Sequence, residues 1–378
     1  MKIMDCYIVD FHAAELGVGA EVALEDSVMR KGLPAKAGSK ILEGFIAPFD
    51  ATVVTRLLDS KYNIAGRIGM NEFGLPSLIS AGTNDIYDAV KAVSAGVVSY
   101  ALCNDVFGVY RRRAAEEGIC YLHPTYGTVS RYGLVPMACS MDQIGVACKN
   151  PDDCFGLLSV IAGNDPKDGT MYPEKSYVYS KTGKELRIGV PAAVLNQADE
   201  GTKESIRRFA AGFTSTDMEL KYFDVYKQVL YILTCAEASS NLTRYDGIKF
   251  GYRASNYKNL NELYTRTRTE ALGVEAKLAA IMGFMVLSQE NYFSYYEKAM
   301  KIRRLIKESL RFGEYDIIVL PTKTSDDSYE NLSLFALAPL AGLPSLSFSF
   351  KGCGIQLVAD AKNENALLTA WEGVKNEV

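Results

Sequence analysis

The histidines and cysteines of this chain, which could carry out nucleophilic catalysis or bind a metal, do not lie in a recognisable catalytic or metal-binding motif. The two histidines, His12 and His123, are the only candidates for the base of a Ser/His/Asp triad, and neither lies in a motif that indicates one. The eight cysteines contain no CxxC pair, and a chain of 378 residues needs no disulfides to hold a core together. We therefore expect reduced, mostly buried thiols, no metal site and no cofactor.

The segment Pro124–Gly145 has the most unusual composition of the chain. It contains two Tyr-Gly pairs, Pro136, Ser130 next to Arg131, and an acid next to an amide, Asp142 and Gln143. A helix does not tolerate this density of glycine and proline, so the segment is predicted to be a series of turns and short extended pieces. Irregular backbone of this kind needs support, and we expect a sheet and a pocket wall to provide it.

Composition limits the class of protein. Hydrophobic residues make up 48% and charged residues 23% of the chain, with a formal net charge of -4. No apolar run reaches the roughly 18 residues of a membrane span, and Asp5 and Asp10 interrupt what would be the apolar part of a signal peptide. The sequence predicts a soluble cytoplasmic protein with no membrane contact and no strongly basic surface for nucleic acid.

Strand-like and helix-like segments alternate along the chain, and no repeat or low-complexity linker interrupts them. This pattern predicts a single α/β domain with helices on both faces of a mixed sheet. Strands are expected at 6–11, 22–27, 99–106, 185–194, 314–322 and 354–359. Helices are expected after Asp50 or Thr52, at 85–98, after the cap Asn150, and at 204–213, 227–242, 270–310 and 364–374.

Four further blocks carry a family resemblance: IAGNDPKDGT (161–170), AEASSNLTRYDGIKFGYR (236–253), YDIIVLPT (315–322) and LAGLPSLSF (340–348). With the segment Pro124–Gly145, they resemble the amidase signature family, and within it the A subunits (GatA) of the glutamyl-tRNA(Gln)/aspartyl-tRNA(Asn) amidotransferases. The resemblance implies one amidase-signature-like α/β domain over 22–378, with a large mixed sheet. It also implies that 1–21 is a shortened N-terminal segment.

Members of this family hydrolyse amides with a nucleophilic serine, a cis-serine and a lysine base. Matched to the family's motifs, VALEDS places Glu25 at the position of the lysine. TNDIYDAVKAVSAG places Asp85 at the cis-serine, and ALCNDVFGVYRRR places Val109 at the nucleophile. An isopropyl group cannot attack a carbonyl carbon, so no catalytic residue of the family is expected here.

The loop that forms the oxyanion hole in the family also differs in this chain. Its DTGG sequence is replaced by Asp105, Val106, Phe107 and Gly108, and bulky residues do not adopt the φ values available to glycine. The resemblance therefore predicts a catalytically inactive scaffold, regulatory or complex-forming subunit. Its expected partners are GatB-like and GatC-like subunits or an active GatA paralogue, with tRNA contacted only indirectly.

Arg111, Arg112 and Arg113 follow the nucleophile position and precede Glu116 and Glu117. One interpretation is a solvated helix with internal Arg/Glu pairs. The other is that the arginines fill the old pocket or bind a carboxylate, a phosphate or a partner.

Three alternatives to an inactive subunit remain open. A cysteine, Cys103 or Cys120, could replace the nucleophile in an active amidase, if a neighbouring group lowered its pKa. Glu25 and Asp85 could form a paired-carboxylate or metal site if both face one cavity. The old pocket could also bind amino acids or amides as a sensor.

Overall fold

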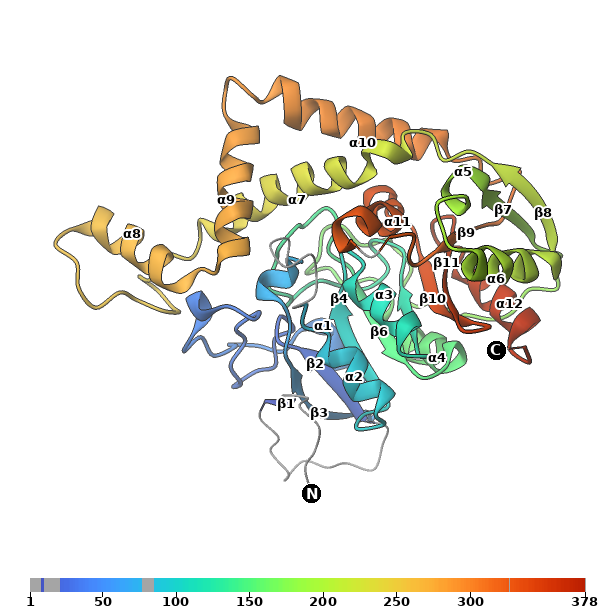
Figure 1. The fold of residues 1–378 in the computed structure, drawn as a ribbon. Coiled ribbons are helices and arrows are strands. Elements are labelled where there is room, and N and C mark those ends of the chain that lie inside the picture. Colours follow the sequence, from blue (N-terminus) through green and yellow to red (C-terminus); the bar gives the residue numbers. More distant parts are fainter. Residues whose placement is uncertain (1–7, 10–20, 77–84, 326, 378) are drawn as a thin grey trace.

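A mixed sheet of eleven strands organises the structure, a computed structural model that describes all residues except 1–7, 10–20, 77–84, 326 and 378 (Figure 1). The strand order is β1-β3-β2-β4-β6-β5-β10-β11-β9-β7-β8. β2 runs parallel to β3 and β4, and β7 runs parallel to β8 and β9, whereas the other pairings are antiparallel. The strands are β1 Ile8–Val9, β2 Glu21–Glu25, β3 Asn63–Ile68, β4 Tyr100–Asn104, β5 Cys120–His123, β6 Ile144–Cys148, β7 Arg187–Pro191, β8 Thr214–Met218, β9 Ile317–Pro321, β10 Ser345–Phe350 and β11 Cys353–Ala359.

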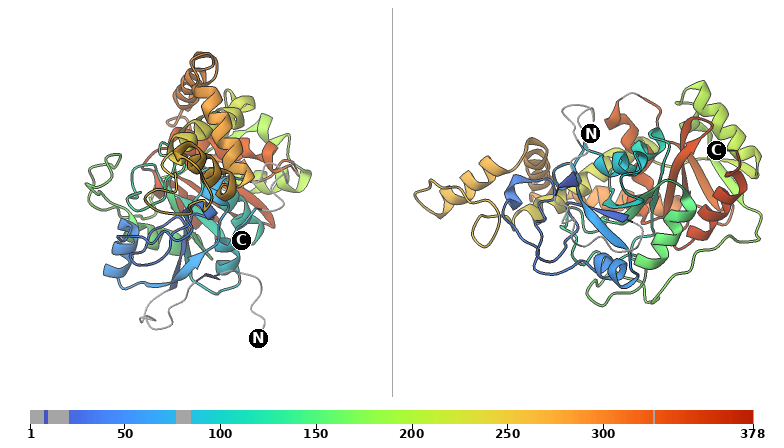
Figure 2. Two further views of the ribbon diagram at one scale, coloured as in Figure 1. Left: turned by 90° about the vertical axis from the view of Figure 1, so that its left-hand side faces the viewer. Right: turned by 90° about the horizontal axis from the view of Figure 1, so that it is seen from below.

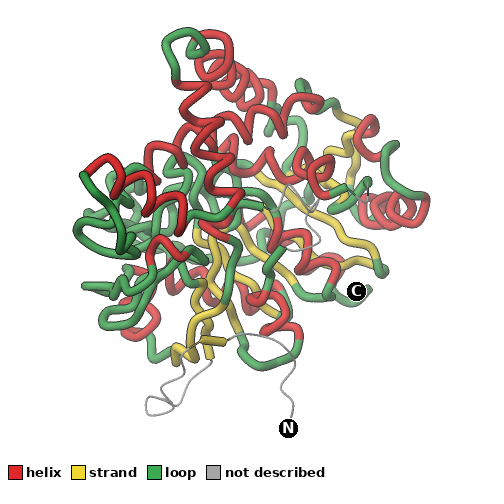
Figure 3. Tube along the Cα trace, turned by 60° about the vertical axis from the view of Figure 1, so that its left-hand side comes forward, coloured by secondary structure: helices red, strands yellow, loops and turns green. Residues whose placement is uncertain are grey.

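Helices cover both faces of this sheet (Figures 1 and 3). The α-helices are α1 Thr52–Asp59, α2 Asp88–Ser94, α3 Val109–Glu116, α4 Pro151–Ile161, α5 Ala192–Leu195, α6 Glu200–Ala211, α7 Tyr226–Leu242, α8 Leu260–Ala271, α9 Val274–Leu287, α10 Lys298–Ser309, α11 Ser328–Ala341 and α12 Glu364–Val374. Short turns of other helix types are η2 Lys40–Leu42, η3 Glu72–Gly74, η4 Phe223–Val225 and the π-helical η5 Phe293–Glu297. No helix among the described residues is long and apolar enough to cross a membrane.

Alternate residues of each central strand belong to different cores, as the two-residue period of a strand requires. On β5, Leu122 packs in a core with α1, α4, α6 and α12, whereas Tyr121 packs in another core with α2 and α3. A third core joins α7, α9 and α11 to β9 and β11. The predicted fold class, a mixed sheet with helices on both faces, is confirmed.

The predicted helices need correction. The long helical tract expected over 270–310 is not continuous: its first two residues end α8, and the extended backbone of Ser288 ends α9 before η5 and α10 begin. The sequence pattern also does not predict the helices α8 and α11. The sequence does contain a capping residue at the start of α8, Asn259, whose side chain accepts a hydrogen bond from the backbone N–H of Glu262. α8 and α9 extend away from the sheet (Figure 2).

The expectation of reduced cysteines is wrong for Cys148 and Cys154, which form a disulfide between the end of β6 and the first turn of α4. Their Cα atoms lie 5.9 Å apart, within the usual range for a disulfide. Spacing alone does not reveal the pair, because the two residues meet only when the strand and the helix have formed.

The segment Pro124–Gly145 is the predicted series of turns between β5 and β6, and side chains hold it from several directions. The backbone N–H and the hydroxyl of Thr125 donate to Glu364 over 2.9 and 2.6 Å. The Ser130 hydroxyl donates to Asp165 over 2.7 Å. Asp142 accepts from the backbone N–H groups of residues 137 and 138 at 3.1 Å each. Distant elements therefore fix this irregular backbone.

Gly133 gives a test of this packing. Its φ of +86° is strained for other residues, and a Cβ there would lie 2.4 Å from the Cα of Ala51. We expect Gly133→Ala to lower the free energy of unfolding by at least about 3 kcal/mol, because strain and a backbone clash add together. Gly32 is the matched control, since its φ is +80° with nothing within 4 Å of the added Cβ. Gly32→Ala should cost only about 1 kcal/mol in urea unfolding, and equal losses would contradict this account.

Candidate functional site

A small cavity at the start of α3 brings together residues far apart in the sequence. Asp85 and Val109, at two of the three positions expected for catalytic residues, both line it. Its volume is about 20 Å³, close to that of a single water site. The residues that line it are Pro76, Asp85, Phe107, Gly108, Val109, Arg112, Tyr329, Asn331, Leu332 and Phe335.

The entry into α3 is fixed by close packing against α11. Gly108 caps the helix with a φ of +81°, and a Cβ on it would lie 2.2 Å from the Phe335 ring. Val109, the first residue of α3, is 9% exposed and presents only an isopropyl group to the cavity. The backbone shape of a strand-to-helix turn is therefore present without a nucleophile at its tip.

The loop before α3 is apolar at its centre. Val106 and Phe107 are both 2% exposed, and the Phe107 ring packs 5.5 Å from that of Tyr231. Neither residue has a positive φ. This agrees with the expectation that bulky residues here do not adopt the backbone available to glycine.

Glu25 lies at the end of β2, has no exposed surface and does not line the cavity. Its carboxylate accepts hydrogen bonds from the Ser27 hydroxyl at 2.5 Å, the Tyr110 hydroxyl at 2.8 Å and the Asn104 N–H at 3.1 Å. Burial raises the pKa of Glu25 to about 7, and these three hydrogen bonds limit the rise.

Asp85 is 6% exposed and faces Arg112 across the cavity. The Arg112 Nη2 lies 3.8 Å from Asp85 Oδ2, and the Asn71 amide donates to Asp85 Oδ1 over 2.9 Å. Burial lowers the pKa of Arg112, although the nearby carboxylates oppose this. Asp85 and Glu25 are held by different residues, so this arrangement does not favour the paired-carboxylate hypothesis.

Arg111 is the most deeply buried cation of the site, with no exposed surface. Its Nε donates to Asp105 Oδ2 over 3.1 Å, and Nη2 donates to the Asp105 carbonyl over 3.1 Å. Nη1 donates to the Phe335 carbonyl over 3.0 Å and to Gln356 Oε1 over 3.2 Å. This network joins the loop, α3, α11 and β11.

The interpretation of a solvated arginine helix is therefore wrong for Arg111 and Arg112, because α3 packs against the sheet and buries both side chains. One expected Arg/Glu pair does form, between the guanidinium of Arg113 and Glu116 at 2.8 Å, three residues along the helix, although the Arg113 side chain is itself half-buried. Three consecutive residues point in different directions on a helix, and sequence alone does not say which direction is buried.

The candidate replacement nucleophiles lie away from the cavity. Burial raises the pKa of the Cys103 thiol well above its usual value, and the nearby Glu25 adds to the effect. The Cys120 thiol is also buried, with its pKa raised, and it lies beside Cys148 and Cys154. His123 is buried against Gln143, and burial lowers its pKa. None of these residues lines the cavity, which disfavours thiolate chemistry there.

The expected pocket wall in the segment Pro124–Gly145 lies elsewhere. Tyr126 and Ser140 line an open hollow of about 410 Å³ beside α10, and no residue of the segment lines the small cavity. Sequence reasoning misses the contribution of Tyr329, Asn331 and Phe335 to the small cavity, because they lie on α11, which the sequence pattern does not predict.

Comparison with known proteins agrees with this fold. The profile of the family described as Amidase matches residues 89–368. The A subunit of the glutamyl-tRNA(Gln) amidotransferase from Lachnoclostridium phytofermentans is 36% identical over 376 residues, which cover 89% of this chain and 76% of the relative. The corresponding protein of Persephonella marina is 35% identical, covering 97% of this chain and 85% of the relative.

Solved structures of two amidase-type proteins share the fold of this chain. The A subunit of the glutamyl-tRNA(Gln) amidotransferase from Thermotoga maritima superposes with a TM-score of 0.74 at 26% identity, covering 94% of this chain and 83% of the other. The peptide amidase of Stenotrophomonas maltophilia has a TM-score of 0.74 at 22% identity, with 95% and 82% coverage, and shares the fold. The matched profile, the relatives and the eleven-stranded sheet show that this chain belongs to the amidase family.

Proposed function

We propose that this amidase-family chain is catalytically inactive and acts as a scaffold, regulatory or complex-forming subunit. The observation that carries the proposal is the lining of the cavity at α3. Among the described residues that line it there is no serine, threonine, cysteine or lysine. Removing a complete catalytic unit lowers kcat by about 10⁶ in well-studied hydrolases, so little amide hydrolysis should survive.

Glu25 is poorly suited to act as the base in place of a lysine. A general base must reach the proton that it removes, directly or through one water. The Glu25 carboxylate already accepts three hydrogen bonds inside the core and is absent from the cavity lining. We assign it a structural role, which joins the end of β2 to β4 and α3.

The size of the cavity also favours a scaffold over a sensor. Sites for small molecules usually enclose about 300–1,000 Å³. The cavity between Val109 and Phe335 holds about 20 Å³ in the described part of the chain, and the Asp85–Arg112 pair borders it. An amino acid or an amide would not fit there without displacing side chains.

We further propose that the chain works in the cytoplasm within an assembly of the amidotransferase type. The relatives are named as A subunits, so each is one part of a larger enzyme. The proposed partners are GatB-like and GatC-like subunits or an active GatA paralogue, with tRNA contacted through the partner.

Exposed apolar side chains on α9 and η5 support the proposal that the chain binds a partner protein. We call these two elements together the apolar arm. Its side chains include Val274, Ile281, Phe284 and Phe293, which are 56%, 66%, 59% and 71% exposed. Large apolar side chains that are exposed on successive turns of one helix, as in α9, differ from the single apolar residues scattered over an ordinary surface and are typical of protein–protein contacts. We propose that the partner protein covers this arm.

The first test is enzymatic. The purified chain incubated with glutamine, asparagine and simple amides should release no ammonia above the blank, at least about 10⁶-fold below an active family member. Any trace should be equal in Cys103→Ala/Cys120→Ala protein prepared in the same way, because it would come from a contaminant. Turnover that this double variant abolishes would show that the chain is an enzyme.

The second test is the pH dependence of stability at Glu25. A carboxyl whose pKa is raised from 4.5 to about 7 by folding stabilises the protein fully below about pH 4.5, and this contribution is lost as pH rises through about 7. Glu25→Gln removes the titration. Its stability relative to wild type should therefore rise by about 2–3 kcal/mol between pH 5 and pH 8 in urea unfolding.

The control for this measurement is Glu117→Gln, at the exposed end of α3. This exposed position reports the general effect of removing one negative charge over the same pH range. A change with pH that is no larger for Glu25→Gln than for Glu117→Gln would show that folding does not raise the pKa of Glu25, and it would contradict this prediction.

The third test addresses the partner. Pull-down from the native host should recover amidotransferase-type subunits with the wild-type chain and lose them with Ile281→Lys/Phe284→Glu. Val178→Lys is the matched control, because Val178 is 81% exposed but lies outside the apolar arm. If the double variant still recovered these subunits, the apolar arm would not be the surface that binds the partner. If the wild-type chain recovered no amidotransferase-type subunit, the proposed assembly would be wrong.

A further inference from the structure

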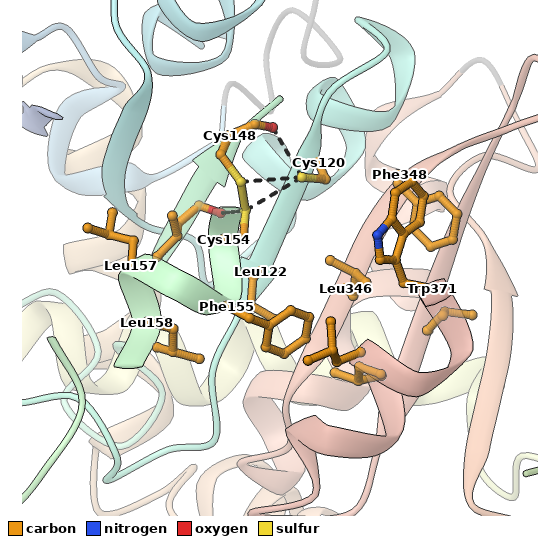
Figure 4. Close-up of a cluster of buried hydrophobic side chains, with 14 of the residues drawn as sticks. Cys120, Leu122, Cys148, Cys154, Phe155, Leu157, Leu158, Leu346, Phe348 and Trp371 are labelled. Carbon is orange, nitrogen blue, oxygen red and sulfur yellow. Dashed lines mark hydrogen bonds between the residues drawn. A yellow bond between two sulfur atoms is a disulfide. The ribbon is translucent and has the colours of Figure 1, made fainter. Parts of the chain in front are cut away.

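Three cysteine sulfurs meet in the core between β5, β6 and α4 (Figure 4). Cys120 begins β5, Cys148 ends β6, and Cys154 lies in α4. The Cys120 Sγ lies 3.5 Å from each of the other two sulfurs, which are bonded to each other. All three residues are at most 1% exposed.

The fold itself brings these residues together. Cys120 and Cys148 are opposite each other in the antiparallel pairing of β5 with β6. Asn150 caps α4 by accepting a hydrogen bond from the Asp153 N–H at 3.0 Å, and this places Cys154 beside the strand pair. The register of β5 against β6 and the capped start of α4 therefore bring the three sulfurs together.

The apolar surroundings of the three sulfurs favour a neutral disulfide and thiol over a charged metal–thiolate centre. Leu122, Leu157 and Leu158 belong to the same apolar core as the sulfurs. Among the described residues, no histidine or carboxylate joins the cluster as a metal ligand. Burial raises the pKa of the Cys120 thiol, and nearby Asp153 adds to the effect. A centre of three thiolates would place net negative charge in this core, whereas a disulfide and a thiol are neutral.

We propose that Cys148 and Cys154 form a reversible redox disulfide, with Cys120 as a third thiol held beside the bond. Oxidation forms one S–S bond and breaks two S–H bonds. The two electrons and two protons pass to a small disulfide such as oxidised glutathione, which becomes two thiols. Reduction by a small dithiol reverses the step. The site is thus a modification site that joins β6 to α4.

The position of Cys120 protects this pairing. Thiol–disulfide exchange requires a thiolate to attack one sulfur along the line of the S–S bond. Because Cys120 Sγ is 3.5 Å from both sulfurs, it lies beside the bond and not behind either atom. Its raised pKa also keeps it as a thiol. The disulfide should therefore not rearrange to Cys120 in the folded protein.

Reaction with an external oxidant should be slow, because the sulfurs are covered. Exposed residues nearby are Lys149, Asp152 and Asp153, at the junction of β6 and α4. Local opening of this junction is the route by which a small oxidant or reductant reaches the pair.

Peptide mapping tests the pairing directly. Trypsin cleavage places Cys120 in 114–131, Cys139 and Cys148 in 132–149, and Cys154 in 150–167. The mass of a linked pair identifies the two peptides, and fragmentation within 132–149 distinguishes Cys148 from Cys139. After treatment with oxidised glutathione, unfolding and alkylation, we expect 132–149 linked to 150–167 through Cys148, and alkylated Cys120. Absence of this link, or a link that includes 114–131, would overturn the proposal.

Variants give a second, independent measurement. Oxidised wild type and Cys120→Ser should melt about 2–5 °C above their reduced forms, since a disulfide across a short loop stabilises modestly. Cys154→Ala should show no difference, and Cys353→Ser, at a half-buried cysteine on β11, should behave like wild type. A stoichiometric zinc or copper ion lost in Cys120→Ser would overturn the proposal in favour of a metal centre.

Discussion

The buried guanidinium of Arg111 is the interaction on which the centre of this structure depends. It has no exposed surface, and it donates to Asp105, to the Phe335 carbonyl and to Gln356. A buried cation is tolerated only when its donors are satisfied, and removing a partner from such a pair costs about 3–5 kcal/mol. The loop before α3, the helix α11 and the strand β11 must therefore keep their relative positions.

This constraint also fixes the shape of the turn that leads into α3. With Arg111 turned into the core, the next residue along α3 faces another direction, and Arg112 reaches Asp85 across the cavity. Gly108 packs so closely against Phe335 that no larger residue fits. These contacts are geometric and electrostatic, and none of them needs the nucleophile that Val109 lacks.

The strands beneath the site are held by a second set of polar contacts. Asn104 ends β4, donates to Asp142 over 2.9 Å, and accepts from the Gln143 N–H over 2.9 Å. Its own N–H donates to Glu25. The turn segment, β4 and β2 are therefore joined through one residue, Asn104, and β6 continues from there to Cys148. The cysteine cluster on β5 and β6 is thus joined through the sheet to β4, and the loop after β4 leads to the cavity.

The sequence by itself determined the fold class and the family, because alternating strands and helices and long matched blocks are read along the chain. It also located α4 and α12, whose capping residue or apolar spacing is local. Only the tertiary structure decided that Arg111 and Arg112 are buried, that α11 closes the cavity and that Cys148 meets Cys154 beside Cys120. Burial and pairing depend on which elements pack together, and residues distant in sequence carry no local signal of that contact.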